Sequence, residues 1–238
     1  ETEYAVLRDA LAAAGDGGSV TLLSDISGDV PVSQNLTILT GGHSITVTTA
    51  SDYYAAPEQN NTIKVWKLFG FYGTNIAVQD SLDINFFLDG SNLKTDGNYT
   101  AKITRIKYAK VAEKQYTKPE TLTEELTKDQ WTARGQYFVI TYDGIAAKEM
   151  PDVVTIQIYE DGHPVSIACQ ESVVSYTRRT LDKNPNNSEL RTVLVDMLNY
   201  GSAAQTHFGY QTATLANAVL TAEELAEGTK DTSVAYHD

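Results

Sequence analysis

The stretch Ser81–Phe86, which reads SLDINF, decides the fold class. Apolar and polar residues alternate along it, so Leu82, Ile84 and Phe86 share one face of an extended strand. Further runs with strand-like composition occur on both sides of it, at Ile63–Leu68, Tyr99–Ile106, Tyr137–Tyr142, Val153–Tyr159 and Val165–Cys169. Many short strands of this kind predict an immunoglobulin-like β-sandwich over residues 62–171.

Asp-Gly dipeptides separate several of these runs and support the sandwich. The pair favours tight turns because both residues tolerate positive φ angles. We expect turns at four such places, Asp89-Gly90, Asp96-Gly97, Asp143-Gly144 and Asp161-Gly162.

The last quarter of the chain has a helical period. Ser188–Phe208 carries an apolar stripe at steps of three and four residues, made of Leu190, Val193, Leu194, Met197, Leu198, Gly201, Ala204 and Phe208. A shorter helix is expected at Ser172–Leu181, and Thr221–Glu224 fits a capping box. We therefore expect residues 172–228 to form an amphipathic helix pair that closes the sandwich, with the long helix buried through its stripe.

The first 55 residues differ from the sandwich. Glu3–Ala14 reads as a short helix that ends at Gly15, and three short β runs follow at Ser19–Leu23, Asn35–Leu39 and Ser44–Thr48. Their spacing is typical of the coils of a right-handed β-solenoid, in which each coil adds a strand to a parallel sheet. We expect residues 1–55 to be a solenoid-like segment and the polar stretch Ser51–Thr62 to be a linker or long loop. The fold class is thus mainly β with C-terminal α.

Composition narrows the function. The formal net charge of the 238 residues is −13, and no cluster of Lys and Arg occurs, which disfavours nucleic acid and anionic bilayers as partners. No apolar run is long enough to insert into a membrane. The single cysteine, Cys169, cannot form an internal disulfide, and we expect it to be a buried small apolar residue. Residue 1 is Glu, so we expect the chain to be a segment of a longer protein.

Candidate catalytic groups are few. Glu149 and Asp152 could act as a glycosidase pair, which needs two carboxylates about 5 to 9 Å apart, but exposed salt bridges are the favoured interpretation. Asp196 and Gln205 on the long helix are expected to make structural hydrogen bonds. The four histidines show no zinc-ligand spacing, and the Asp-Gly loops lack the closing acid of a calcium loop. We expect no enzyme activity, no metal and no cofactor.

Tyrosine is the unusual residue, with 14 Tyr against 6 Phe and 2 Trp. Its ring can stack on sugars or anchor a protein interface while its hydroxyl stays polar. The candidate ligand-binding residues are Tyr53, Tyr54, Tyr108 and Tyr116, which occur in polar sequence. Other tyrosines are expected to lie in strand or helix cores, namely Tyr137, Tyr142, Tyr159, Tyr200 and Tyr210.

Three motifs carry a family resemblance. They are GIAAKEM at Gly144–Met150, VDMLNYGSAAQ at Val195–Gln205, and FGY at Phe208–Tyr210 followed by LAN at Leu215–Asn217. Over about residues 67–220 the chain resembles a module repeated in large secreted and wall-attached surface proteins of clostridial gut anaerobes, some of which resemble immunoglobulin-binding superantigens. The resemblance implies a secreted, cell-surface, multidomain protein, and no catalytic activity.

Three functions follow as hypotheses. The first is an adhesin module that binds a host protein, with immunoglobulin as the named partner. The second is a carbohydrate-binding module, suggested by the sandwich and the tyrosine excess. The third is a passive spacer that contacts only the neighbouring modules of its own chain.

Overall fold

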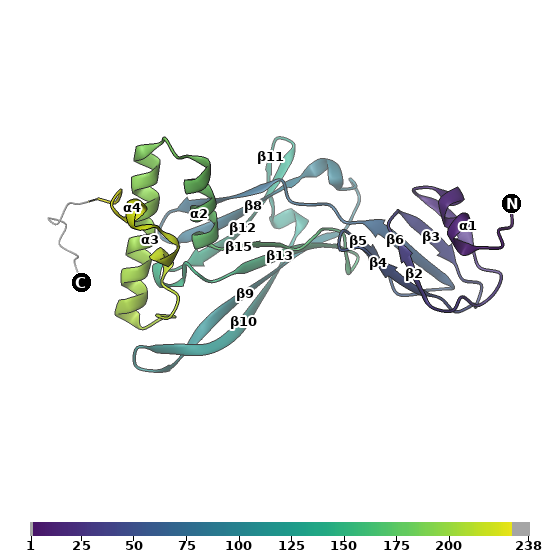
Figure 1. Ribbon diagram of the computed structural model, residues 1–238, viewed down its shortest axis with the longest axis horizontal. Helices are drawn as coiled ribbons and strands as arrows, with labels where there is room; N and C mark the ends of the chain where they lie inside the picture. Colours follow the sequence, from purple (N-terminus) through teal and green to yellow (C-terminus); the bar gives the residue numbers. More distant parts are fainter. Residues whose placement is uncertain (1, 230–238) are drawn as a thin grey trace. The chain divides into compact units, whose positions relative to one another are not determined.

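The computed structural model describes residues 2–229, and over that range the chain is mainly β with helices near the C-terminus, as predicted (Figure 1). It divides into two compact units. Unit 1 holds residues 2–70, Asn92–Thr100 and Gln157–Ala168, and unit 2 holds Phe71–Ser91, Ala101–Ile156 and residues 169–229. Strands β9 and β13 contribute residues to both units.

Unit 1 begins with α1 (Leu7–Ala14), which starts four residues later than predicted and ends at Gly15 with φ +66°. Four short strands follow, β1 (Gly18–Thr21), β2 (Asp29–Val32), β3 (Leu36–Leu39) and β4 (Thr46–Thr49). β1 pairs with β3 and β2 pairs with β4, both in parallel. Parallel pairing between successive turns of chain is the arrangement that the solenoid-like spacing predicted.

The predicted linker contains a strand. β5 (Tyr53–Ala55) pairs with β6 (Thr62–Lys67), and β6 pairs antiparallel with β3 on its other side. The sequence predicts Thr62–Lys67 in the sandwich, whereas these pairings put it in the sheet of unit 1, in the order β1-β3-β6-β5. Because β6 runs antiparallel to β3, it ends the parallel series. The apolar core of this unit is formed by Val20, Leu22, Val30, Val32, Leu36, Ile38, Ile63 and Val65.

A long hairpin supplies one edge of the second sheet. Its strands are β9 (Tyr99–Ala112) and β10 (Gln115–Thr127), and β9 also neighbours β13 (Val154–Glu160). β14 (His163–Pro164) and β15 (Cys169–Glu171) both pair with β13. The predicted strand Val165–Cys169 is wrong, because the chain between β14 and β15 is not a strand. Asp161 and Gly162 both have positive φ and join β13 to β14 as a two-residue turn, as predicted.

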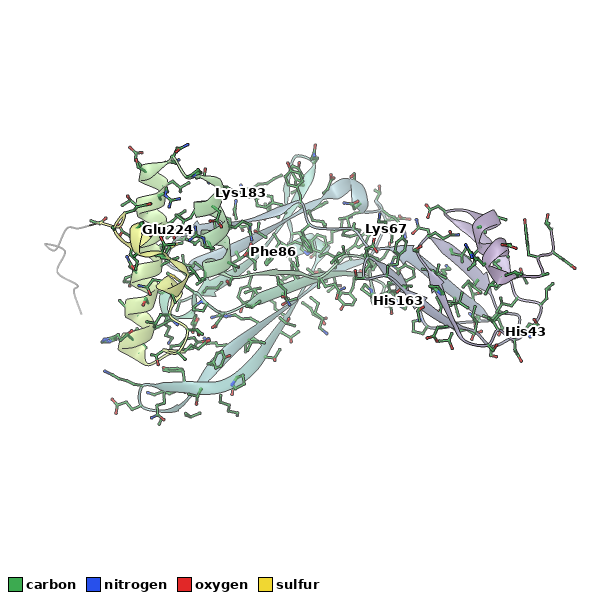
Figure 2. All side chains as sticks on the ribbon, viewed as in Figure 1. His43, Lys67, Phe86, His163, Lys183 and Glu224 are labelled. Atoms are coloured by element: carbon green, nitrogen blue, oxygen red, sulfur yellow. The ribbon has the colours of Figure 1, made fainter. Side chains whose placement is uncertain are left out.

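The third sheet lies in unit 2 and has the order β11-β12-β8-β7. Its strands are β7 (Gly73–Val78), β8 (Leu82–Asp89), β11 (Thr132–Arg134) and β12 (Tyr137–Ile145), with η1 (Gly90–Asn92) and η2 (Lys128–Gln130) near its ends. The alternation in Ser81–Phe86 is confirmed: Leu82, Ile84 and Phe86 are buried on one face (Figure 2 labels Phe86). Asp143-Gly144 is not a turn between strands but lies inside β12, where the register shifts and Gly144 has φ +76°.

Helices complete unit 2. They are η3 (Ala147–Glu149), α2 (Val173–Lys183), α3 (Ser188–Phe208), η4 (Ala216–Val219) and α4 (Ala222–Leu225). The bounds predicted for the long helix are confirmed, and so is the capping box, in which Glu224 N donates to Thr221 Oγ1 and Thr221 N donates to Glu224 Oε2. α3 makes its most extensive helix contacts with η3 and η4, and also contacts α2.

The buried face of α3 is rotated from the predicted stripe. Leu194, Leu198 and Gly201 are buried as expected, but Val193 is 63% exposed and Phe208 is 46% exposed. The buried face instead includes Arg191, Val195, Ser202 and Gln205. Polar residues are buried here because the neighbouring turns supply hydrogen-bond partners, so hydrophobicity alone misplaces the face.

Gly201 allows a close approach between α3 and η3. A Cβ atom at this position would lie 2.4 Å from Met150 Sδ and 3.2 Å from the Ala147 carbonyl oxygen. The prediction that glycine lets the helix approach a neighbour is confirmed, and the neighbour is the turn that follows β12.

Candidate functional site

The four tyrosines proposed from sequence fall into two separate groups. Tyr53 and Tyr54 are successive residues of β5 in unit 1, so their side chains point to opposite faces. Tyr53 packs against the apolar core of that unit. Tyr54 lies against Trp66, with ring centroids 5.1 Å apart, and against His163, at 6.2 Å. Intramolecular packing therefore explains both residues, and they do not form one binding platform.

Tyr108 and Tyr116 come together around a third tyrosine, Tyr210, in unit 2. The ring of Tyr210 lies 6.1 Å from Tyr108 and 5.4 Å from Tyr116. Tyr210 is fully buried and its hydroxyl accepts a hydrogen bond from the backbone N–H of Tyr108 at 3.0 Å. The hairpin β9–β10 is thereby attached to the segment that follows α3.

A lysine covers this aromatic group. Lys148 Nζ lies 4.9 Å from the ring centroid of Tyr116, 5.1 Å from that of Phe208 and 5.9 Å from that of Tyr210. A cation held over aromatic faces stabilises by about 0.5 to 2 kcal/mol. The Lys148 ammonium covers one face of the Tyr116 ring and Tyr210 is fully buried, so the two rings do not form an open stacking platform.

Beneath this layer lies a buried ionic network centred on Arg105. Its guanidinium Nη2 donates to Glu149 Oε2 at 2.6 Å and to Asp152 Oδ2 at 2.8 Å. Asp152 also accepts hydrogen bonds from the Tyr210 hydroxyl at 2.8 Å and from Gln211 Nε2 at 2.7 Å. Lys107 Nζ lies 2.9 Å from Glu149 Oε1. Both acids form salt bridges, as expected, but the expectation that they are exposed is wrong, because both are buried.

The electrostatics of the pair do not favour acid–base chemistry. Burial raises the pKa of the Glu149 carboxyl, but hydrogen bonds from Lys107 and Arg105 outweigh burial, and the pKa lies below its usual value. Burial is the largest effect on Asp152 and holds its pKa above the usual value despite the hydrogen bonds from Arg105. Both carboxylates share one guanidinium, which leaves no space between them for a sugar bond or a water.

Other polar candidates from the sequence have structural partners. The buried Gln205 amide accepts from Ala216 N at 2.7 Å and donates to the Thr214 carbonyl at 3.0 Å. Asp196 Oδ1 accepts from Thr229 N at 2.7 Å. The Cys169 thiol is half-buried, and burial followed by the charge of Glu171 raises its pKa, which makes it a poor nucleophile.

Metal ligands do not cluster in the described residues. Over residues 2–229 no group of His, Cys, Asp and Glu is arranged to hold a metal ion. His43 lies in the loop after Gly42 and His163 in β14 rather than a turn, while His237 falls outside the described range. Within the same range, no helix has the length and hydropathy needed to span a bilayer.

Sequence reasoning missed two exposed aromatic features. The first is Tyr72, which is 70% exposed and lies 4.6 Å from Tyr137, centroid to centroid. The second is Tyr200 on α3, which is 55% exposed although it was expected in a core. The position of Tyr200, two helical turns after Val193 and one turn after Met197, was the available signal, since these residues lie on one side of α3. Tyr72 had no local signal, because its contact with Tyr137 joins two distant strands.

Comparisons with known proteins give no relative. No family model, no curated protein and no solved structure matches this chain.

Proposed function

We propose that this chain is a non-catalytic, extracellular binding module of a multidomain bacterial surface protein, and that its main partner is a host protein. The three motifs quoted from the sequence support the cell-surface setting. The engagement of Glu149 and Asp152 by Arg105 supports the absence of catalysis at that pair. An immunoglobulin-like sandwich and attachment to neighbouring modules stay predictions.

The observation that carries the proposal is the outward face of α3. Val193 is 63% exposed and Tyr200, seven residues further along, is 55% exposed, whereas Met197 between them is partly buried against the core. Aromatic residues and Met are enriched in protein interfaces, and a helix face is a common docking element. An apolar stripe on a chain with a net charge of −13 is costly in water unless a partner covers it.

Immunoglobulin is the partner that we propose, on the resemblance to superantigen-type surface proteins. The test is retention of serum and intestinal antibody on the immobilised chain, followed by calorimetry with Fab fragments. The double variant Val193→Ser, Tyr200→Ser should lose binding, whereas Tyr72→Ala, on a separate sheet face, should keep it. If no antibody class is retained at micromolar concentrations, immunoglobulin is ruled out as the partner.

A second candidate is carbohydrate binding, which the exposed Tyr72–Tyr137 pair favours. Aromatic rings of this kind stack on the apolar faces of sugars. If both kinds of partner fail to bind, a passive spacer is the remaining function.

A further inference from the structure

The side of the sheet β11-β12-β8-β7 opposite its fully buried face carries an ordered row of side chains, in the middle of which Val139 is only 6% exposed. Directly opposed residues share a face, and the register places Tyr137 opposite Asp89, Val139 opposite Phe87, and Thr141 opposite Asn85. On β7 the corresponding positions are Gly73 and Asn75. The other face of β8 holds Ile84, Phe86 and Leu88 and is fully buried. This face therefore has aromatic residues at one end and amides at the other, and the row of Phe87 and the buried Val139 lies between them.

The aromatic end is open to solvent. Tyr72 precedes β7, and its ring lies over that of Tyr137 with an interplanar angle of 38°. Beside them Gly73 leaves open space, because a Cβ atom there would meet nothing within 4 Å. One face of the Tyr72 ring is covered by Tyr137, and with 70% of the residue exposed the other is available to a flat apolar surface.

The polar end is a hydrogen-bonded ladder across three strands. Thr141 Oγ1 donates to Asn85 Oδ1 at 2.7 Å, and Asn85 Nδ2 donates to Asn75 Oδ1 at 2.8 Å. Within residues 2–229 no protein acceptor is found for the Asn75 amide N–H groups. The ladder fixes the orientation of these amides and leaves donors at its end on β7 for hydroxyl groups of a ligand.

We propose that this face binds a neutral glycan, with one sugar ring stacked on Tyr72 beside Gly73 and the following sugars hydrogen-bonded to the Asn75–Asn85–Thr141 ladder. The inference rests on the carbohydrate-binding function named above and assigns its site. Four residues of β12 separate the Tyr137 and Thr141 rows, a distance of about 13 Å that a short oligosaccharide spans.

The charged residues on this face favour a neutral glycan over an acidic one. Asp89 stands in the Tyr137 row, and its carboxylate accepts the Ser91 backbone N–H at 2.9 Å, which lowers its pKa. A carboxylate beside the stacking ring repels uronic and sialic acids and accepts hydrogen bonds from hydroxyl groups. Arg134, opposite Tyr137 in the register of β11 and β12, is exposed. A neutral polysaccharide therefore fits this surface better than an acidic one.

The test is native electrophoresis of the whole chain through gels that contain a neutral β-glucan, a xylan or mucin, with a polysaccharide-free gel as reference. Tyr72→Ala removes the stacking ring. Gly73→Val places a side chain in space that is open in the wild type, so it should block the site. The backbone at Gly73 does not have a positive φ, so the valine causes no backbone strain and removes no native contact. Tyr200→Ser on α3 is the matched control for loss of an exposed tyrosine.

The wild type and Tyr200→Ser should be retarded by at least one neutral polysaccharide. Tyr72→Ala should weaken the affinity about tenfold, and Gly73→Val should abolish the retardation. If no polysaccharide retards the wild type, the inference fails while antibody binding is decided by its own experiment. If Tyr72→Ala and Gly73→Val are retarded as strongly as the wild type, carbohydrate binding stands and this site is wrong. Retardation by mucin alone would contradict the neutral-glycan assignment.

Discussion

Arg105 and Glu149 form an ion pair in which Nη2 and Oε2 are 2.6 Å apart and both side chains are 2% exposed. The pair joins β9 to the turn η3, and Asp152 shares the same guanidinium. A buried charge of this kind is strongly destabilising when its partner is removed, because the remaining ion has neither water nor a counter-ion.

Arg105→Met should therefore destabilise unit 2 by about 3 to 5 kcal/mol at pH 7. The difference in unfolding free energy between Arg105→Met and the wild type should become smaller as the pH falls, because protonation of Glu149 and Asp152 removes the unpaired charges. Urea unfolding at neutral and at acidic pH measures both effects. Lys102→Met, on the same strand but half-exposed, is the control and should change stability by less than about 1 kcal/mol. Equal losses in the two variants would contradict the role given to Arg105.

Leu198 and Val193 lie on opposite sides of α3 and give a matched pair. Leu198→Ala should cost about 2 to 5 kcal/mol, since the side chain is fully buried. Val193→Ala should cost almost nothing, because its side chain is exposed. Leu194→Asp should prevent folding by burying an unpaired charge. Thermal melts decide: similar losses for Leu198→Ala and Val193→Ala would mean that the buried face of α3 is assigned incorrectly.

Gly201→Ala tests the close approach of α3 to η3. The added methyl group would lie 2.4 Å from Met150 Sδ and should cost about 1 to 3 kcal/mol through overpacking, although alanine favours helix. In the background of Met150→Ala, which removes the clashing sulfur, the same substitution should cost less. A double-mutant cycle in chemical denaturation measures this coupling. Additive free energies would show that Met150 is not the obstacle.

Glu224, which Figure 2 labels, should make the stability of the C-terminal segment depend on pH in the acid range. Hydrogen bonds from Arg178 are the main cause that lowers its pKa from 4.5 to about 2. Because the folded-state pKa is depressed, the ionised carboxylate stabilises the fold above about pH 4.5, and this contribution disappears as the pH falls towards 2. The stability difference between wild type and Glu224→Gln should be largest at pH 5 and close to zero at pH 2. Glu223→Gln, at the exposed adjacent position, is the control variant.

Local patterns predicted elements well where the periodicity was long or the turn chemistry strict. The 21 residues of α3, the capping box at Thr221 and the turn at Asp161-Gly162 were all predicted at their observed positions. In unit 1, β1, β3 and β4 lie at predicted β runs and the parallel pairing follows from their spacing, whereas β2 (Asp29–Val32) was missed.

Tertiary interactions explain the failures. Tyr53–Ala55 is a strand only because β6 pairs with it, so its polar neighbours read as a linker. The buried face of α3 includes Gln205 because the segment that follows the helix folds back and offers its backbone to the amide. The ring pair Tyr72–Tyr137 joins residues far apart in sequence, and no local rule connects them. Sites built from such contacts cannot be predicted from the periodicity of the sequence.

The hydrogen bond from Tyr108 N to the Tyr210 hydroxyl has a consequence for the order of folding. It spans 102 positions of sequence, and the same hydroxyl donates a hydrogen bond to Asp152. A chain made from its N-terminus cannot satisfy Asp152 until residue 210 has been synthesised and released. Until then the ionic network around Arg105 lacks the hydrogen bond from Tyr210. Contacts between residues this far apart in sequence also form slowly. Unit 2 should therefore acquire its native structure only after synthesis of its last helices, and a chain that stops before Tyr210 should remain sensitive to proteases.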